Sequence, residues 1–282
     1  MRLTSFRTDR GASWGVVNGD GIVDLGRALD ARFPTLRSAL EADALAELID
    51  HARGRSPDHS LDRVAFDPVI PWPDKVLCVG VNYVAHRLET GRDAVSHPTL
   101  FTRFANTLVG HNGALVRPRV SSQLDFEGEM AVIIGRRARH VARADALDHV
   151  AGYACFNDAS IRDWQRHTTQ FTPGKNFVAT GALGPWMVTR DDLPDPTRSE
   201  VVLRLNGDEM QRSTTDLLIF DVPALIEYIS AFTELAPGDV IATGTPGGVG
   251  WKREPPVFMK RGDVVEVEVR GVGVLRNTVA DE

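Results

Sequence analysis

The segment LDFEGEMAVIIG, residues 124–135, constrains the fold more than any other part of the chain. Its β-branched and apolar residues, ended by Gly135, predict a β-strand. Side chains two positions apart share one face of a strand, so Asp125, Glu127 and Glu129 should point the same way. Three like charges side by side repel one another unless arginines, protons or a metal ion lie among them. The segment therefore predicts a strand that carries a charged site.

A further acid follows the next predicted strand. Residues 150–156 are apolar, end at Asn157 and Asp158, and precede a short predicted helix. An acid at that place either caps the helix or belongs to a site held by the strand ends. With Glu127 and Glu129 it would form an all-oxygen set, and the chain has no HExxH motif or paired cysteines for zinc. Such a set suits Mg²⁺ or Mn²⁺, and suits Ca²⁺ less because Ca²⁺ takes more ligands. A solvent-exposed strand face with arginine partners is the alternative.

The first seventy residues, 1–70, have the pattern of a small N-terminal α+β domain. Short strands are predicted over residues 2–7, 13–19 and 21–26, and the leucine spacing of residues 35–53 predicts a helix. The segment PVIPWPDK, residues 68–75, carries three prolines and cannot pair within a central strand. We therefore place a domain boundary at residue 70.

Residues 71–282 are predicted to form a mainly β catalytic domain. Strands are expected over residues 75–83 and 263–279, and a hairpin over 201–213 turns at Asn206 and Gly207. Helices are expected only near 142–149, after Asp158, and over 222–234. This distribution of strands and helices predicts an α+β fold, mainly β, built as a sandwich or barrel.

Composition excludes several classes of protein. The 282 residues carry a net charge of −6 with no basic tract, which argues against a nucleic-acid partner. No apolar run reaches the ~18 residues of a membrane span, and the start of the chain lacks an apolar signal segment. We expect a cytoplasmic protein that does not bind a membrane. Cys78 and Cys155 lie in apolar runs and are expected to be buried free thiols.

Five motifs follow one another along the chain: NYVAHRLE (82–89), DFEGE (125–129), NDASIRDWQ (157–165), GKNF (174–177) and TGTPGGVG (243–250). In this order they resemble the fumarylacetoacetate hydrolase family, in the branch of acylpyruvases and fumarylpyruvate hydrolases. The resemblance covers roughly residues 75–280. It implies a distorted β-sheet roll, assembled as a homodimer, and residues 90–113 as a lid over the substrate.

The resemblance also implies roles for nine residues. The metal ligands would be Glu127, Glu129 and Asp158. The catalytic residues would be His86 and Glu89, as an acid–base pair, and Lys175 beside the substrate. Substrate-binding residues would be Arg162, Gln165 and Thr245. From the residues alone, His86 with Glu89 could also be an exposed helix pair, and Lys175 an ordinary surface lysine.

The implied activity is metal-dependent hydrolysis of a C–C bond in an acylpyruvate (a 2,4-dioxo acid), in the catabolism of aromatic compounds or amino acids. His86 would deprotonate water and Glu89 would orient the imidazole. The same site could serve a decarboxylase of 2-oxo acids such as oxaloacetate, or an isomerase or hydratase of a catechol-pathway intermediate. The His–Glu pair favours hydrolysis, because a decarboxylase has no obligatory water to activate.

Overall fold

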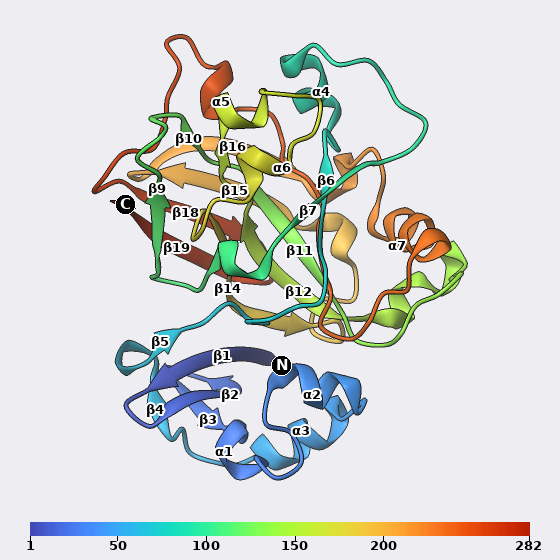
Figure 1. The fold of residues 1–282 in the computed structure, drawn as a ribbon. Helices are drawn as coiled ribbons and strands as arrows, with labels where there is room; N and C mark the ends of the chain where they lie inside the picture. The colour runs from blue at the N-terminus through green and yellow to red at the C-terminus, as the bar shows by residue number, and fades with distance from the viewer.

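The computed structural model describes all residues from 1 to 282. Strands dominate, and the chain forms a large body with a smaller N-terminal unit beside it (Figure 1). The predicted class, α+β and mainly β, is confirmed. No helix combines the length and the apolar character needed to cross a bilayer.

The N-terminal unit is a small meander with short helices. Its strands are β1 (Arg2–Thr8), β2 (Gly11–Asn18), β3 (Gly21–Asp24), β4 (His59–Ser60) and β5 (Ala65–Phe66). Its helices are α1 (Leu25–Ala28), α2 (Leu36–Glu41), α3 (Leu45–Ala52) and the 3₁₀ turn η1 (Leu61–Arg63). The single helix predicted over 35–53 is wrong: Asp43 takes a left-handed φ of 52°, which ends α2 and lets α3 start in a new direction.

One large sheet runs through both parts of the chain. β1 pairs with β14 (Gly181–Thr189), and the sheet continues through β12 (Val150–Asn157), β11 (Gly128–Ile134), β17 (Val240–Ala242), β6 (Val76–Gly80) and β7 (Thr99–Arg103). β8 (Leu108–Val109) also pairs with β14. The sheet thus crosses the boundary predicted at residue 70, and the division into two domains stays a prediction.

A second sheet packs against the first. Its order is β16 (Asp208–Thr214), β15 (Glu200–Leu205), β18 (Val264–Val269), β19 (Gly273–Asp281) and β9 (Ala114–Arg117). The hairpin β15–β16 turns at Asn206 and Gly207, with φ values of 55° and 89°, as its sequence predicts. The two strands predicted over 263–279 are β18 and β19.

Short elements fill the connections. They are α4 (Val84–Thr90), α5 (Arg162–Gln165), α6 (Thr172–Lys175), α7 (Val222–Phe232), η2 (Ala105–Thr107), η3 (Arg143–His149), η4 (Pro196–Arg198), η5 (Thr215–Leu217) and η6 (Gly250–Lys252). α4, α5 and α6 gather at the end of the body that lies away from the N-terminal unit (Figure 1). The lid expected over residues 90–113 is wrong in part, because β7 and β8 of the large sheet lie within that range.

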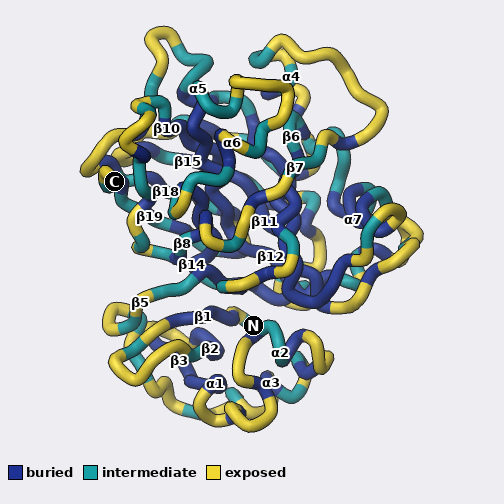
Figure 2. Tube along the Cα trace, in the orientation of Figure 1, coloured by how far each residue is buried: buried dark blue, intermediate teal, exposed yellow.

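β11 lies at the centre of the body and is buried along its whole length (Figure 2). Met130, Val132 and Ile134 join the core between the two sheets. Ala131 and Ile133 join a second core, which includes side chains of the N-terminal unit. A strand covered on both faces explains the unbroken apolar run of MAVIIG, and it excludes a solvent-exposed face for Glu129.

The strand predicted from residue 124 onward is interrupted. Its first part, β10 (Leu124–Asp125), pairs with β13 (Ser160–Ile161), whereas β11 starts only at Gly128. Glu127 therefore lies in the gap between two strands that pair with different parts of the chain.

Candidate active site

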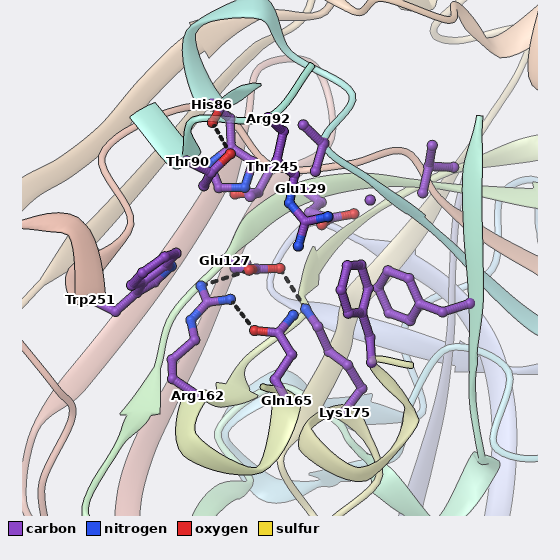
Figure 3. A pocket seen from close by; sticks show the side chains of 15 residues that line it. His86, Thr90, Arg92, Glu127, Glu129, Arg162, Gln165, Lys175, Thr245 and Trp251 are labelled. Carbon is purple, nitrogen blue, oxygen red and sulfur yellow. Dashed lines mark hydrogen bonds and ion pairs between the residues drawn. The ribbon is translucent and has the colours of Figure 1, made fainter. Parts of the chain in front are cut away.

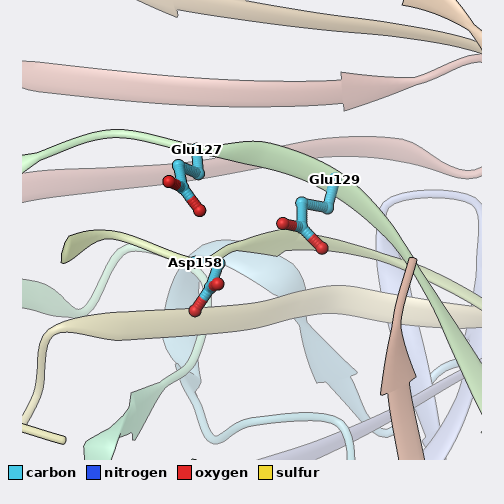
Figure 4. A group of neighbouring side chains, drawn as sticks. All are labelled: Glu127, Glu129 and Asp158. Carbon is cyan, nitrogen blue, oxygen red and sulfur yellow. The ribbon is translucent and has the colours of Figure 1, made fainter. Parts of the chain in front are cut away.

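Three carboxylates meet where β11 begins and β12 ends. Gly128 pairs with Asn157 across these strands, so Glu127, Glu129 and Asp158 lie on either side of that pair. The N–H of Asp158 donates to the carbonyl of Glu127 at 2.9 Å. One oxygen from each carboxylate lies within 4.8 Å of the others, and all three residues are buried (Figure 4). The structure thus brings the three predicted metal ligands together.

Lys175 lies at the end of α6 and points into this cluster. Its ammonium is 2.7 Å from Oε2 of Glu127 and 2.6 Å from Oδ2 of Asp158. It also donates to the carbonyl of Asp158 at 3.1 Å. Gly174 makes the approach possible, since a Cβ there would lie 2.5 Å from backbone atoms of Gln165. Lys175 is thus a buried member of the carboxylate cluster, and its interpretation as an ordinary surface lysine is wrong.

Arg103, at the end of β7, was not predicted. Its Nη1 donates to Oδ1 of Asp158 at 2.5 Å and to the carbonyl of Ala159 at 3.0 Å, while its Nη2 donates to Thr180 at 2.9 Å. These bonds fix the carboxylate that Lys175 also touches. The residue was missed because its segment was assigned to the lid. Only the pairing of β6 with β7 carries it to the cluster.

Asp125 has the same spacing as the two glutamates, but its carboxylate binds neighbouring backbone and Arg162 instead of joining the metal-binding set. Its carboxylate accepts from the N–H groups of Gly250 at 2.8 Å and Trp251 at 3.1 Å. It also accepts from Nε of Arg162 at 2.7 Å. Nη2 of Arg162 lies 2.7 Å from Oε1 of Glu127, an ion pair whose angles fall outside hydrogen-bond geometry. Arg162 therefore joins Asp125 to the cluster.

The carboxylates of the cluster differ in their electrostatics. Burial raises the pKa of Glu127, but the charges of Lys175 and Arg162 outweigh burial and lower that pKa to about 2. Burial, reinforced by the charges of Asp158 and Glu127, raises the pKa of Glu129 well above its ordinary value. Glu129 has no cationic partner, and its Oε2 accepts only the N–H of Gly244 at 2.8 Å. The cluster thus lacks positive charge on the side of Glu129.

A divalent cation fits this charge distribution. Around the cluster the buried acids are Asp125, Glu127, Glu129 and Asp158, and the buried cations are Arg103, Arg162 and Lys175. With all four carboxylates ionised, four negative charges would face three positive ones. Converging carboxylate oxygens without nitrogen or sulphur donors are the ligands of hard cations. The three residues Glu127, Glu129 and Asp158 could hold such an ion, whose charge would offset the burial and repulsion that raise the pKa of Glu129.

His86 and Glu89 lie three residues apart on α4, as predicted. Nδ1 of His86 is 3.2 Å from Oε2 of Glu89, and the other oxygen of Glu89 accepts from the N–H of Gly248 at 2.9 Å. A carboxylate only accepts, so Nδ1 carries a proton, and in the neutral imidazole the lone pair that can act as a base is on Nε2. His86 is 5% exposed, so the pair is not an exposed helix pair.

Two glycines of the TGTPGGVG motif bring backbone N–H groups to carboxylates of the site. The N–H of Gly244 donates to Glu129, and the N–H of Gly248 donates to Glu89. Gly244 has φ 105°, and a Cβ there would lie 2.7 Å from Cβ of Asn82 and 3.0 Å from the carbonyl of Val79. The side chain of Asn82 holds this turn, because it donates to the carbonyls of Phe220 at 2.9 Å and Thr243 at 2.8 Å. Neighbouring Val81 has φ 59°, a strained value for a β-branched residue.

The remaining predicted residues surround one narrow cavity of about 50 Å³ (Figure 3). Gln165 lines it and accepts from Nη1 of Arg162 at 2.9 Å. Thr245 lines it and accepts from Nε2 of Gln211 at 2.8 Å. The other predicted residues in its wall are His86, Glu127, Glu129, Arg162 and Lys175. This volume holds only a few water molecules. A substrate can therefore enter only when side chains at the mouth of the cavity move.

Two of the wall residues that were not predicted as part of the site are Trp251 and Arg92. Trp251 lines the cavity and follows the TGTPGGVG motif directly in the sequence. Arg92 lines it from the segment that follows α4. The position of Trp251 beside a predicted pocket motif could have revealed it. Arg92 lies in the segment 90–113 that the resemblance assigned to a lid, which was the one signal that placed it near the substrate.

Comparison with known proteins agrees with this geometry. The family model "Fumarylacetoacetate (FAA) hydrolase C-terminal" matches residues 75–280. The chain is 39% identical over 288 residues to oxaloacetate tautomerase FAHD2B, mitochondrial, of Homo sapiens, covering 99% of this chain and 91% of that protein.

Two solved structures extend the comparison. Maleylpyruvate hydrolase from Sphingobium sp. SYK-6, in complex with manganese(II) ion and pyruvate, is 31% identical with a TM-score of 0.83, covering 100% of this chain and 99% of that one. 5-Carboxymethyl-2-hydroxymuconate delta-isomerase from Mycobacterium smegmatis is 34% identical with a TM-score of 0.79, at the same coverage. With the ordered motifs and the buried carboxylates in place, the chain belongs to the fumarylacetoacetate hydrolase family of enzymes.

Proposed function

We propose that the chain interconverts the keto and enol forms of a short 2-oxo dicarboxylate such as oxaloacetate. Glu127, Glu129 and Asp158 would hold Mg²⁺ or Mn²⁺ for this reaction. The observation that carries the proposal is the His86–Glu89 pair, because His86 lines a small polar cavity together with Glu127 and Glu129. The similarity to an oxaloacetate tautomerase over nearly the whole chain supports the choice of substrate.

The residues account for a balanced proton transfer. Nε2 of His86 removes a proton from C3, and the electrons of the C–H bond form the C2=C3 double bond while the oxygen on C2 takes the negative charge. The protonated imidazole of His86 then returns this proton to the oxygen on C2, which completes the enol and restores the neutral histidine. Glu89 holds the imidazole in the tautomer required and stabilises its protonated form. Lys175 is placed to stabilise negative charge next to the carboxylates. The bound cation would supply Lewis-acid stabilisation of the substrate oxygens.

Hydrolysis of an acylpyruvate is the second candidate. Its support is the same base, because Nε2 of His86 can deprotonate water as well as carbon, and the likeness to a solved maleylpyruvate hydrolase. Water would add at C4, the C3–C4 bond would break, and pyruvate and a carboxylic acid would leave. We propose a homodimer for either activity, as the family resemblance implies, and sedimentation would test it.

The two candidates separate in one experiment. Purified protein with Mn²⁺ is given enol oxaloacetate or acetylpyruvate, and the loss of the enol absorbance and the release of pyruvate are measured. The proposal requires enol loss above the spontaneous rate, together with faster exchange of the C3 protons for solvent deuterium. Cleavage of acetylpyruvate without enhanced exchange in oxaloacetate would replace it by the hydrolase.

A further inference from the structure

Arg92 differs from the other cations of the pocket because its guanidinium makes no ion pair or hydrogen bond within the chain. Arg162 and Lys175 also line the pocket, and both are bound to carboxylates. Arg166 and Lys252 lie near Trp251 but do not line the cavity. Among Arg92, Arg162 and Lys175, Arg92 is therefore the one without a carboxylate partner in the chain.

The structure holds Arg92 in this position by its backbone and by an aromatic surface. Gly91 takes a left-handed φ of 67° at the end of α4, and the N–H of Arg92 donates to the carbonyl of Arg87 at 3.1 Å. The guanidinium carbon lies 5.1 Å from the ring centre of Phe171, another wall residue. Stacking uses the flat face of a guanidinium and leaves its N–H edge available. Figure 3 shows Arg92 among the side chains around the cavity.

The charge of the pocket indicates what Arg92 binds. The buried acids exceed the buried cations by one charge, so a divalent cation would leave the site with one positive charge. Arg92 adds a positive charge at its own end of the pocket, where no carboxylate of the chain pairs with it. One carboxylate of the ligand belongs beside the metal-binding residues, and the planar donor edge of Arg92 matches a second carboxylate at the mouth of the pocket.

We propose that Arg92 is the specificity residue of this site and that it binds the distal carboxylate of a dicarboxylate substrate. The inference rests on the proposed function in one respect: the 2-oxo acid end of the substrate is taken to lie beside Glu127, Glu129 and Asp158. It names the ligand class independently of the reaction: short 2-oxo or 2-hydroxy dicarboxylates, in preference to the corresponding monocarboxylates.

Binding of two matched ligands tests the proposal. Malate and lactate share the 2-hydroxy acid group, and only malate has a second carboxylate. Their dissociation constants are measured by calorimetry on the Mn²⁺-loaded protein. We expect the parent protein to prefer malate, and R92Q to bind malate about 10–100-fold more weakly with lactate affinity unchanged. R92K should recover part of the preference. R63Q, which removes an exposed arginine of the N-terminal unit, should behave as the parent.

The outcomes distinguish this inference from the proposed function. Equal malate affinity in the parent and R92Q overturns the role of Arg92, even if the protein tautomerises oxaloacetate. An equal loss of malate and lactate affinity in R92Q shows a general effect on the pocket and overturns it too, as does a parent protein without preference for malate. Arg92-dependent preference in a protein without tautomerase activity supports the inference and rejects the proposed reaction.

Discussion

The ammonium of Lys175 lies 2.6 Å from Oδ2 of Asp158, and both side chains are buried. Removing one partner of a buried ion pair leaves an uncompensated charge, which costs about 3–5 kcal/mol. K175M should therefore melt well below the parent in a chelator. Mn²⁺ should raise its melting temperature more than that of the parent, because the ion no longer competes with the lysine. K260M, at an exposed lysine, is the control, and an equal response to Mn²⁺ in K175M and the parent would contradict this account.

Glu129 should be required for metal binding and dispensable for folding. Its raised pKa favours a neutral side chain without metal, and an amide can still accept the N–H of Gly244. E129Q should therefore melt near the parent in a chelator but lose the stabilisation by Mn²⁺. Chelation of the parent should abolish activity, and Mg²⁺ or Mn²⁺ should restore it. Full activity after exhaustive chelation would reject the metal site.

His86 should act as the base of the reaction. H86A should lower kcat about 10²–10⁴-fold, the usual effect of losing a general base, with unchanged affinity for Mn²⁺. The exposed helical pair His51–Glu47 provides a matched control, because H51A removes a histidine that also faces a glutamate. A kcat for H86A equal to that of H51A would exclude His86 from the chemistry.

Gly244 should be irreplaceable because of its contacts as well as its φ. G244A would bring a Cβ to 2.7 Å from Asn82 and should lose stability and activity together. Gly11 has a similar φ of 108°, and a Cβ added there would meet nothing within 4 Å, so G11A isolates the backbone strain of about 1–3 kcal/mol. Urea unfolding should show a larger loss for G244A than for G11A. Equal losses of unfolding free energy would mean that the close contact between position 244 and Asn82 contributes nothing to the effect.

His111 should make stability depend on pH. Burial, assisted by the nearby charge of Arg276, lowers its pKa to about 4, compared with about 6.5 in the unfolded chain. Between these values the unfolded state binds the extra proton, so the contribution of neutral His111 is full above about pH 6.5 and is lost as the pH falls towards 4. H111Q should reduce this dependence in urea unfolding at pH 7 and pH 5. An unchanged dependence would exclude His111 as its source.

The sequence by itself determined the chemistry that the site can offer. Glu127 and Glu129 lie in one short motif and His86 and Glu89 in another, and the order of these motifs carried the family resemblance from which their roles were inferred. Helix periodicity places His86 and Glu89 on one side of α4. The hairpin at Asn206–Gly207 and the strands β18 and β19 were equally predictable, because turn residues and alternation act over a few positions. These features depend on contacts between residues that are close in the chain.

Tertiary structure alone decided which side chains surround that chemistry. Asp125 has the same spacing as the two glutamates, but β10 ends there and its carboxylate is bound by Gly250, Trp251 and Arg162. Arg103 reaches Asp158 only because β7 pairs with β6. Arg92 reaches the cavity only because α4 ends at a left-handed glycine. Strand pairing and chain reversal join residues that are distant in sequence, and periodicity carries no information about such contacts.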